Sequence, residues 1–520
     1  MAIRFKPDLP SNNGGDNRGG GRGGRNNNAM IMAIIMFVFR YPKIGIPLVI
    51  IGLIFFAITG GPSSLQSDSS QDNIYNMGCE IDQERYDASQ VYAALSPSSS
   101  KYSLPKAVSL RRFTPTPQNQ GEQGSCVGWA SAYAARTTLE AATVGGNPNS
   151  MTFSPSFLYN QIGLRGCQGA YTGEALEHMK RKGLLHFSKF AYDPYSCTKR
   201  PTQGQLQEAM RYKIRGYNRL TKTGRNYDVD LEAVKQNIAQ GAPVIIAAKV
   251  PYSFQDMMGK KVWHPSASEA RNVNQHGGHA MCLIGYDDNK QQFEIMNSWG
   301  TDWGDNGYVF VSYRDFKTFC REAYGVFPHP KAKSASATDF AIECGLYNVK
   351  NRQNLTLRHV RDNLFETVAP VTKGTEMKIE ITNSLECFTY VFSKEADKGG
   401  RQGTALTVFP PSDKYSSYMG IVGTRLFPRE GVGKFYADNE GNRDFMAIVY
   451  SKEELNPEEI RRAIDRAGKG NFHDNVMAAI GNRAFKTLTY SSKSGQNIAF
   501  KQRANAKEDV AVVVIAMDKQ

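Results

Sequence analysis

The pattern of apolar and polar positions sets the first 60 residues apart from the rest of the chain. Residues 11–28 hold almost no apolar side chain, residues 29–39 are almost all apolar, and an uncharged run extends from Ile44 to Thr59. About sixteen helical residues span about 24 Å, less than the roughly 30 Å of a bilayer core. Two charges and a proline separate the two runs, and charges at mid-membrane are costly. We therefore expect 29–39 to form a helix at the membrane interface and 44–60, extended by its neighbours, to form a single transmembrane helix.

The charges that flank these runs predict an orientation. Residues 1–43 carry 7 Lys and Arg against 2 Asp and Glu, whereas residues 62–103 carry 2 against 6. Lys and Arg are retained on the cytoplasmic side, so we expect the amino terminus in the cytoplasm and the chain after about residue 61 in the periplasm or outside the cell. A cleaved signal peptide is the alternative. We expect residues 1–28 to be a disordered cytoplasmic tail and residues 61–103 to be a polar stalk.

A cysteine stands at the start of a predicted helix in the globular part of the chain. The glycines and the serine of residues 121–125 lead directly into a helical stretch that begins at Cys126. The unpaired N–H groups and the positive dipole end of a helix amino terminus stabilise a thiolate relative to a thiol. Cys126 is therefore the candidate nucleophile.

Three further residues supply the groups that a nucleophilic cysteine needs. His279 opens a strand-like run and Asn297 follows the next one, so adjacent strands would place the two side by side. The amide oxygen of the asparagine would then accept from one imidazole nitrogen and leave the other to face the thiolate. Gln120 precedes the cysteine by six residues and can aim its amide NH₂ at a developing oxyanion, together with the backbone N–H of Cys126.

These residues lie in three blocks whose order and separations resemble those of the papain-like cysteine peptidases, the family of papain and the cathepsins. The blocks are Asn119-Gln120-Gly121 with Gly124-Ser125-Cys126, then Gly278-His279-Ala280, and then Asn297-Ser298-Trp299-Gly300. The resemblance covers about residues 104–330 and implies an α+β fold of two lobes, one helical and one a β-barrel. It implies that Cys126 is the nucleophile, His279 the general acid and base, Asn297 the residue that orients the imidazole, and Gln120 an oxyanion donor.

The resemblance also implies a substrate-binding surface and a disulfide. The positions that would contact substrate are Gly169, Ala170, Gly278, Ala280 and Trp299, the last of which would also shield the bond between the asparagine and the histidine. Gln123 stands where the usual partner of Cys167 would be, so Cys197 is the implied partner. Two other candidates receive no role, because Cys282 lies inside an apolar strand and His276 in a loop. The residues before Leu104 contain no long helical pro-segment, which argues against control by a zymogen.

The pattern changes to β-strands after a linker rich in Lys, Ala and Ser, residues 331–345. Residues 377–382 alternate as a strand, turn at Asn383 and continue through 388–392. Further strands are predicted at 405–409, 445–450 and 510–515, and one helix is predicted from N-cap Asn456 to Gly468. We expect residues 346–520 to form a mainly-β, sandwich-like domain. It shows no catalytic constellation, so we interpret it as a docking module for a protein partner or substrate, or as a spacer.

The charge and the cysteine count exclude some classes of function for this chain. The net charge of +14 is spread along the chain without a Lys/Arg block, which favours a mildly basic surface over a nucleic-acid partner. Eight cysteines are too few for a disulfide scaffold. The sequence therefore predicts a membrane-anchored cysteine endopeptidase acting on polypeptides through an acyl-enzyme, with no metal or cofactor. Amidase or transpeptidase action on cell-wall peptides is one alternative, and a catalytically silent peptide-binding or adhesion protein is another.

Overall fold

The computed structural model describes residues 3–7, 75–91, 94–96, 103–221, 228–328, 339–396, 403–429, 433–486, 488–502 and 507–520. The expected membrane anchor, residues 29–60, lies outside the described residues. Among those that are described, no helix is long and apolar enough to cross a bilayer.

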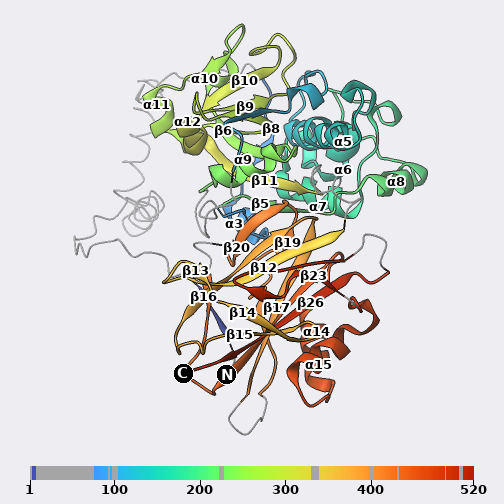
Figure 1. Ribbon diagram of the computed structural model, residues 1–520. Coiled ribbons are helices and arrows are strands. Elements are labelled where there is room, and N and C mark those ends of the chain that lie inside the picture. Colours follow the sequence, from blue (N-terminus) through green and yellow to red (C-terminus); the bar gives the residue numbers. More distant parts are fainter. Residues whose placement is uncertain are drawn as a thin grey trace, which may run out of the picture. The chain divides into compact units, whose positions relative to one another are not determined.

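The peptidase-like region contains a helical lobe and a sheet lobe (Figure 1). The sheet has the order β5-β11-β6-β8-β9-β10-β7, with β3 joined to β8. Its strands are β3 (Ala107–Ser109), β5 (Gly216–Arg219), β6 (Val244–Val250), β7 (Val262–Trp263), β8 (Gly277–Asp287), β9 (Gln292–Met296), β10 (Tyr308–Ser312) and β11 (Cys320–Phe327). The helices are α4 (Cys126–Gly128), α5 (Thr137–Val144), α6 (Pro155–Ile162), α7 (Thr172–Arg181), α8 (Gln203–Ala209), α9 (Leu231–Ala239), α10 (Tyr252–Gln255), α11 (Ala267–Arg271) and α12 (Tyr313–Phe319). A π-helical segment, Trp129–Arg136, joins α4 to α5.

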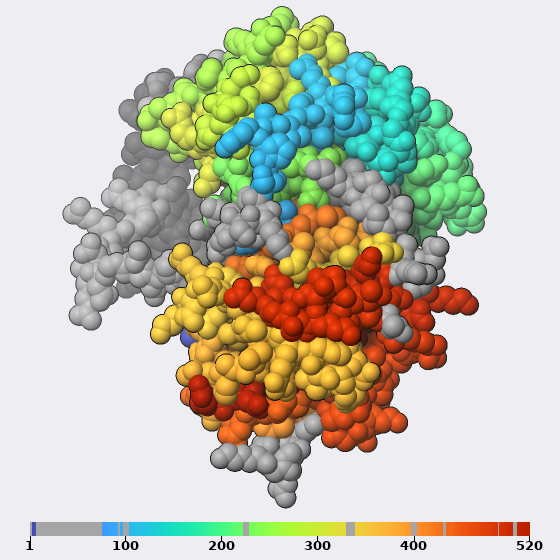
Figure 2. Space-filling view, viewed as in Figure 1, coloured from blue at the N-terminus to red at the C-terminus, as the bar shows by residue number. Residues whose placement is uncertain are grey.

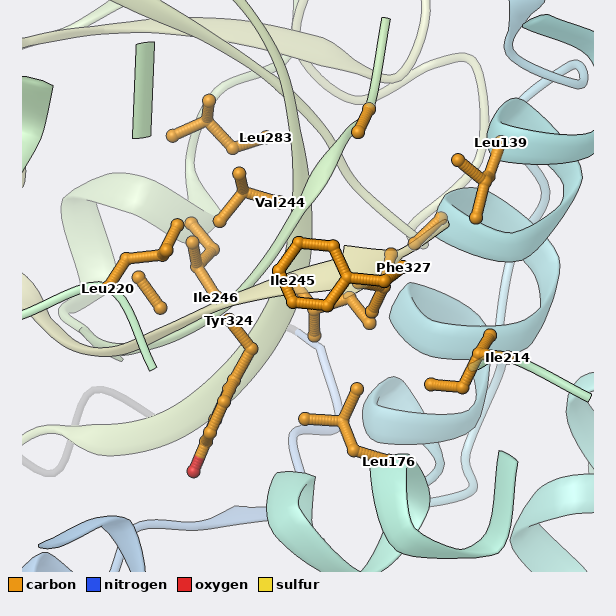
Figure 3. Packing of buried hydrophobic residues seen from close by; sticks show 14 of the residues in the cluster. Leu139, Leu176, Ile214, Leu220, Val244, Ile245, Ile246, Leu283, Tyr324 and Phe327 are labelled. Carbon is orange, nitrogen blue, oxygen red and sulfur yellow. The ribbon is translucent and has the colours of Figure 1, made fainter. Parts of the chain in front are cut away.

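The two lobes share one hydrophobic core. Figure 3 shows side chains of the sheet, among them Ile245 and Leu283, facing Leu139 of α5 and Leu176 of α7. The sequence of β6 is an almost continuous apolar run because the strand is buried on both of its faces. The core therefore fixes the start of α4 against the strand that carries His279.

The C-terminal domain is a sandwich of two sheets around a second core. One sheet has the order β1-β21-β16-β12-β25-β23 and the other β18-β17-β22-β26-β15-β14-β24. Strands of the first are β1 (Arg4–Pro7), β12 (Phe340–Asn348), β13 (Gln353–Asn354), β16 (Glu376–Asn383), β20 (Gly423–Phe427), β21 (Gly433–Tyr436), β23 (Thr489–Ser492) and β25 (Ile498–Gln502). Strands of the second are β14 (Leu357–Arg361), β15 (Leu364–Thr367), β17 (Cys387–Ala396), β18 (Leu406–Phe409), β19 (Tyr418–Met419), β22 (Arg443–Ser451), β24 (Ser494–Gly495) and β26 (Val510–Asp518). Helices α14 (Pro457–Arg466) and α15 (Phe472–Ile480) complete it.

Three details of this domain differ from the expectation. The turn after Asn383 does not return the chain along β16, because β16 and β17 belong to different sheets. The domain starts at Phe340 and not at residue 346, since β12 already pairs with β25 there. The predicted helix is followed by a second helix, α15, which the sequence pattern did not predict.

The amino-terminal residues also differ from the expected disordered tail. Arg4–Pro7 form β1, which pairs antiparallel with β21 of the C-terminal domain. Ile3 is fully buried, and its carbonyl accepts a hydrogen bond of 2.7 Å from the Ser393 hydroxyl. A short apolar anchor next to a sheet edge is sufficient to order these few residues.

The described part of the expected stalk contains a short strand and a short helix. It contains β2 (Cys79–Glu80), which pairs with β4 (Ala170–Tyr171), and α3 (Gln83–Ala88), which is capped by the Asp82 carboxylate. Tyr86 of α3 is fully buried. The segment is mostly polar, but Cys79, Tyr86, Val91 and Leu95 among its described residues are buried.

Candidate active site

Cys126 lies at the first residue of α4, with Ser125 as the N-cap residue. Its side chain is fully buried, and its Sγ accepts a hydrogen bond of 3.4 Å from the backbone N–H of Ala280. The predicted helix is continuous from here through the π-helical segment into α5. Burial raises the pKa of the Cys126 thiol to about 11, so the thiol is neutral in this form.

His279 and Asn297 are brought together by the pairing of β8 with β9, as the sequence predicts. His279 lies on β8, and Asn297 follows the last residue of β9. The distance from His279 Nε2 to Asn297 Oδ1 is 2.8 Å. Because an amide oxygen only accepts, Nε2 carries the proton and Nδ1 is the basic nitrogen. Nδ1 is buried and has no hydrogen-bond partner among the described residues, and burial lowers the pKa of His279 to about 4.

Gln120 is fixed in an orientation that points its NH₂ group into the cleft. Its Oε1 accepts a hydrogen bond of 2.7 Å from the Ser298 hydroxyl, and the two carbonyl oxygens beside the other end of the amide, which only accept, identify that end as the NH₂ group. Its Nε2 donates to the carbonyl of Gln123 and to the carbonyl of Asn76, each at 3.0 Å. The group expected to stabilise an oxyanion therefore already binds a peptide carbonyl.

Trp299 stacks on the imidazole of His279. Its ring lies 4.4 Å from the ring of His279 on one side and 4.6 Å from the ring of Tyr75 on the other, both nearly parallel. Its indole N–H points to the Asn76 carbonyl at 3.4 Å. The tryptophan thus shields the bond between His279 and Asn297 from water.

A segment of the same chain occupies the cleft. We call residues 75–81 the cleft strip. The backbone N–H of Ala170 donates to the Gly78 carbonyl at 2.9 Å, and β2 runs parallel to β4. The N–H of Gly78 is one of the backbone groups that face the Cys126 sulfur. The strip therefore lies across the nucleophile and pairs with the residues expected to bind substrate.

Glycines make room for this close passage. A Cβ added to Gly278 would overlap the carbonyl of Cys79, and a Cβ added to Gly169 would lie 2.8 Å from the Gly78 oxygen. On the opposite side, Gly124 and Gly78 meet backbone to backbone. The cleft accepts the main chain of a polypeptide between two walls that lack side chains at these points.

The disulfide implied by the resemblance is present. Cys167 and Cys197 are bonded and close a loop that lies next to Gly169 and Ala170. Cys282 is a free, fully buried cysteine on β8, and His276 bonds the Glu269 carbonyl through Nε2 at 3.0 Å, so neither joins the catalytic group. The described residues contain no cluster of three or more His, Cys, Asp or Glu side chains that could hold a metal.

A buried carboxyl group lies under the end of the cleft strip. Glu322 on β11 is 3% exposed and is surrounded by the backbone N–H of Asp82 and the hydroxyls of Thr172 and Tyr324. Burial raises the pKa of Glu322 to about 8. The thiol of Cys79 lies 3.5 Å from the same Thr172 hydroxyl. Sequence reasoning gave Glu322 no role, because nothing in its local pattern reveals what covers it.

Comparisons with known proteins identify the family of residues 104–327. The family model described as papain family cysteine protease matches residues 104–327. An uncharacterized peptidase C1-like protein of Acanthamoeba polyphaga mimivirus is 30% identical over 221 residues, which cover 39% of this chain and 68% of the viral protein. The chain belongs to the papain family of cysteine proteases. Cathepsin K of Gallus gallus is 30% identical over 227 residues, which cover 42% of this chain and 61% of the cathepsin. Xylellain, a cysteine protease from Xylella fastidiosa, matches at 23% identity and a TM-score of 0.39, over 48% of this chain and 95% of xylellain.

Proposed function

We propose that this member of the papain family hydrolyses peptide bonds in polypeptides. The observation that carries the proposal is that an extended peptide, the cleft strip, already lies across Cys126 with its backbone paired to Ala170. A cleft that holds one polypeptide main chain between glycine-lined walls has the shape to hold another.

The residues divide the reaction among them. Once the thiol proton has passed to Nδ1 of His279, the Cys126 thiolate attacks the substrate carbonyl carbon. The oxyanion that forms is stabilised by Nε2 of Gln120 and the N–H of Cys126. His279 then gives its proton to the departing amine, leaving a thioester. The imidazole next takes a proton from water, whose oxygen attacks the thioester and releases the acid, and the proton returns to the thiol.

The closed form described above cannot carry out the first step. The Asn76 carbonyl holds the oxyanion donor, and burial keeps both the thiol and the imidazole neutral. Displacement of the cleft strip would let water reach Cys126 and His279 and relieve the desolvation that opposes the ion pair. We therefore propose that the chain is a latent peptidase, in which the cleft strip keeps the enzyme inactive until it is displaced.

Two further parts of the proposal concern location. The apolar run 44–60 with its neighbours 29–39 supports attachment to a membrane, and we propose that the peptidase domain lies in the periplasm or outside the cell. The bridge between Cys167 and Cys197 fits an oxidising compartment.

The test uses an unstructured peptide substrate and the full chain carrying Gly78→Ala, which opens the cleft so that turnover can be measured. Cys126→Ala should abolish hydrolysis without lowering the melting temperature, since it removes only one sulfur atom. Undiminished turnover in this variant would refute the assignment of the nucleophile.

A further inference from the structure

The cleft strip is held by contacts of its own, which include hydrogen bonds from the N–H of Tyr75 to the Gln255 amide oxygen at 3.2 Å and from the N–H of Ala170 to the Gly78 carbonyl at 2.9 Å. Strand β2 is only two residues long, and the ring of Tyr75 and the carbonyl of Asn76 add one stack and two hydrogen bonds. A strand this short is marginal without further anchoring. The residues that follow the strip, 82–91 and 94–96, add further anchors, and we call them the connecting segment.

The peptidase domain supplies one set of anchors. Tyr86 is fully buried against Tyr324, and its hydroxyl lies within hydrogen-bond distance of the backbone N–H and carbonyl of Ala323. Asp87 forms an ion pair with Arg219 of β5. Figure 1 shows α3 close to β5, on the side of the peptidase domain that faces β19 and β20.

The C-terminal domain supplies a second set. The N–H of Val91 donates to the Lys414 carbonyl at 2.9 Å, and the N–H of Ser416 donates back to the Val91 carbonyl at 3.2 Å. The N–H of Ser96 donates to the Thr424 carbonyl at 3.2 Å. The side chain of Leu95 fills the space beside Gly423, where an added Cβ would lie 3.2 Å from it. Val91 also forms a bridge to Arg219, so it is held between the two domains.

The two domains are joined directly around this segment. Gln240 of the peptidase domain donates to the Val422 carbonyl at 2.6 Å and accepts from the Val422 N–H at 3.0 Å. Arg429 and Asp230 form an ion pair of 2.9 Å in which both side chains are about nine-tenths buried. Figure 2 shows orange atoms of the C-terminal domain directly against green atoms of the peptidase domain. The C-terminal domain cannot leave the connecting segment without breaking these contacts.

We propose that the C-terminal domain is a clamp that helps to keep the cleft closed, and that release of the enzyme requires this domain to move away from residues 89–91 and 94–96. The inference rests on the proposed latency and adds what controls it. Three backbone hydrogen bonds and one apolar contact tie the connecting segment to the C-terminal domain. Because the connecting segment continues directly into the cleft strip, it holds the strip at high effective concentration above Cys126. A surface that competes for Lys414–Ser416 or Val422–Thr424 would open the cleft.

The experiment measures cleft opening without relying on catalysis. The full chain is treated with iodoacetamide, and the rate at which Cys126 is alkylated is followed by mass spectrometry of the peptide that carries it. All six free cysteines are buried, so the reading must be made at this residue. Peptide hydrolysis is measured in parallel.

Two variants weaken the clamp in different ways. Leu95→Asp places a charge against Gly423, and Gln240→Ala removes two contacts between the domains without touching the connecting segment. Each should raise the rate of Cys126 alkylation by about 10- to 100-fold, the range expected for the loss of one or two net hydrogen bonds or a buried apolar contact. Val360→Asp, at a residue that is 46% exposed on β14, is the matched control and should leave the rate unchanged. Gln240→Ala keeps the test decisive if Leu95→Asp does not fold.

The outcomes separate the two proposals. If alkylation is unchanged in both clamp variants while Tyr75→Ala, which loosens the strip itself, accelerates it, the clamp is overturned and the closed cleft stands. If alkylation accelerates in the clamp variants but no peptide is hydrolysed, the clamp stands and the proposed peptidase activity fails.

Discussion

Gly78→Ala is the sharpest perturbation of the closed form, because it adds one methyl group to the cleft strip and changes no residue of the catalytic group. A Cβ on Gly78 would lie 2.5 Å from the carbonyl carbon and 2.6 Å from Cα of Gly124, and closer still to the Gly124 oxygen. Ordinary contacts of this kind are about 3.5 to 4.0 Å, and the atoms on both sides are backbone, which cannot rotate away. Overpacking of this size costs about 1 to 3 kcal/mol.

That cost applies to the closed form alone, since in the open form residue 78 faces solvent. The closed-to-open ratio should therefore fall about 5- to 140-fold. Alkylation of Cys126 by iodoacetamide should accelerate by the same factor, and hydrolysis of an added peptide should increase. Gly204→Ala is the matched control, since a Cβ at Gly204 has no atom within 4 Å. If Gly78→Ala reacts at the rate of the unmodified protein, residues 75–81 do not occupy the cleft in solution.

Three other changes test separate parts of the structure. Asn297→Ala should lower kcat about 10- to 100-fold with little effect on KM, because it removes the group that orients the imidazole but no reacting group; an unchanged kcat would show that Trp299 alone holds the ring. Burial raises the pKa of Glu322 from 4.5 to about 8, so the folded protein holds a proton that the unfolded chain releases, and between these pH values the free energy of unfolding should fall by up to about 1.4 kcal/mol per pH unit. Denaturant titrations of the unmodified protein and of Glu322→Gln should show a difference in this free energy that changes over the window, and a constant difference would contradict the argument. Reduction of the bond between Cys167 and Cys197, which are 30 residues apart, should lower the free energy of unfolding by roughly 3 to 4 kcal/mol, as measured by denaturant titration with and without reductant.

The catalytic group could be predicted because each of its members belongs to a short local pattern. Cys126 begins a helix after a glycine-rich loop, and His279 and Asn297 stand at the ends of strand-like runs that are neighbours in sequence. A helix start and a pairing of two strands that are neighbours in sequence were therefore enough to predict that these three residues lie together. The two-sheet domain could also be predicted as mainly β, because its strands show alternation of apolar and polar residues.

The cleft strip could not be predicted, because its structure depends on partners that are distant in sequence. Cys79 pairs with Ala170, and a strand of two residues shows no periodicity. The one available signal was a cysteine in an otherwise polar stretch. The placement of β16 and β17 in different sheets could not be predicted for a related reason. A turn at Asn383 looks the same in sequence whether the chain returns along the same sheet or passes to the opposite one.

The pairing of β1 limits the number of times that the chain can cross a membrane. Residues before Asp8 and after Ile74 belong to the same folded unit, and Arg4–Pro7 pair with Gly433–Tyr436. A bilayer crossed once between those two points would leave β1 and β21 on opposite faces, where they could not form hydrogen bonds. If β1 and β21 of one molecule pair, the chain between them must cross the bilayer an even number of times, so that both strands lie on the same side. An odd number is compatible with β1 only if the strand is absent from the sheet or is supplied by a second copy on the same side.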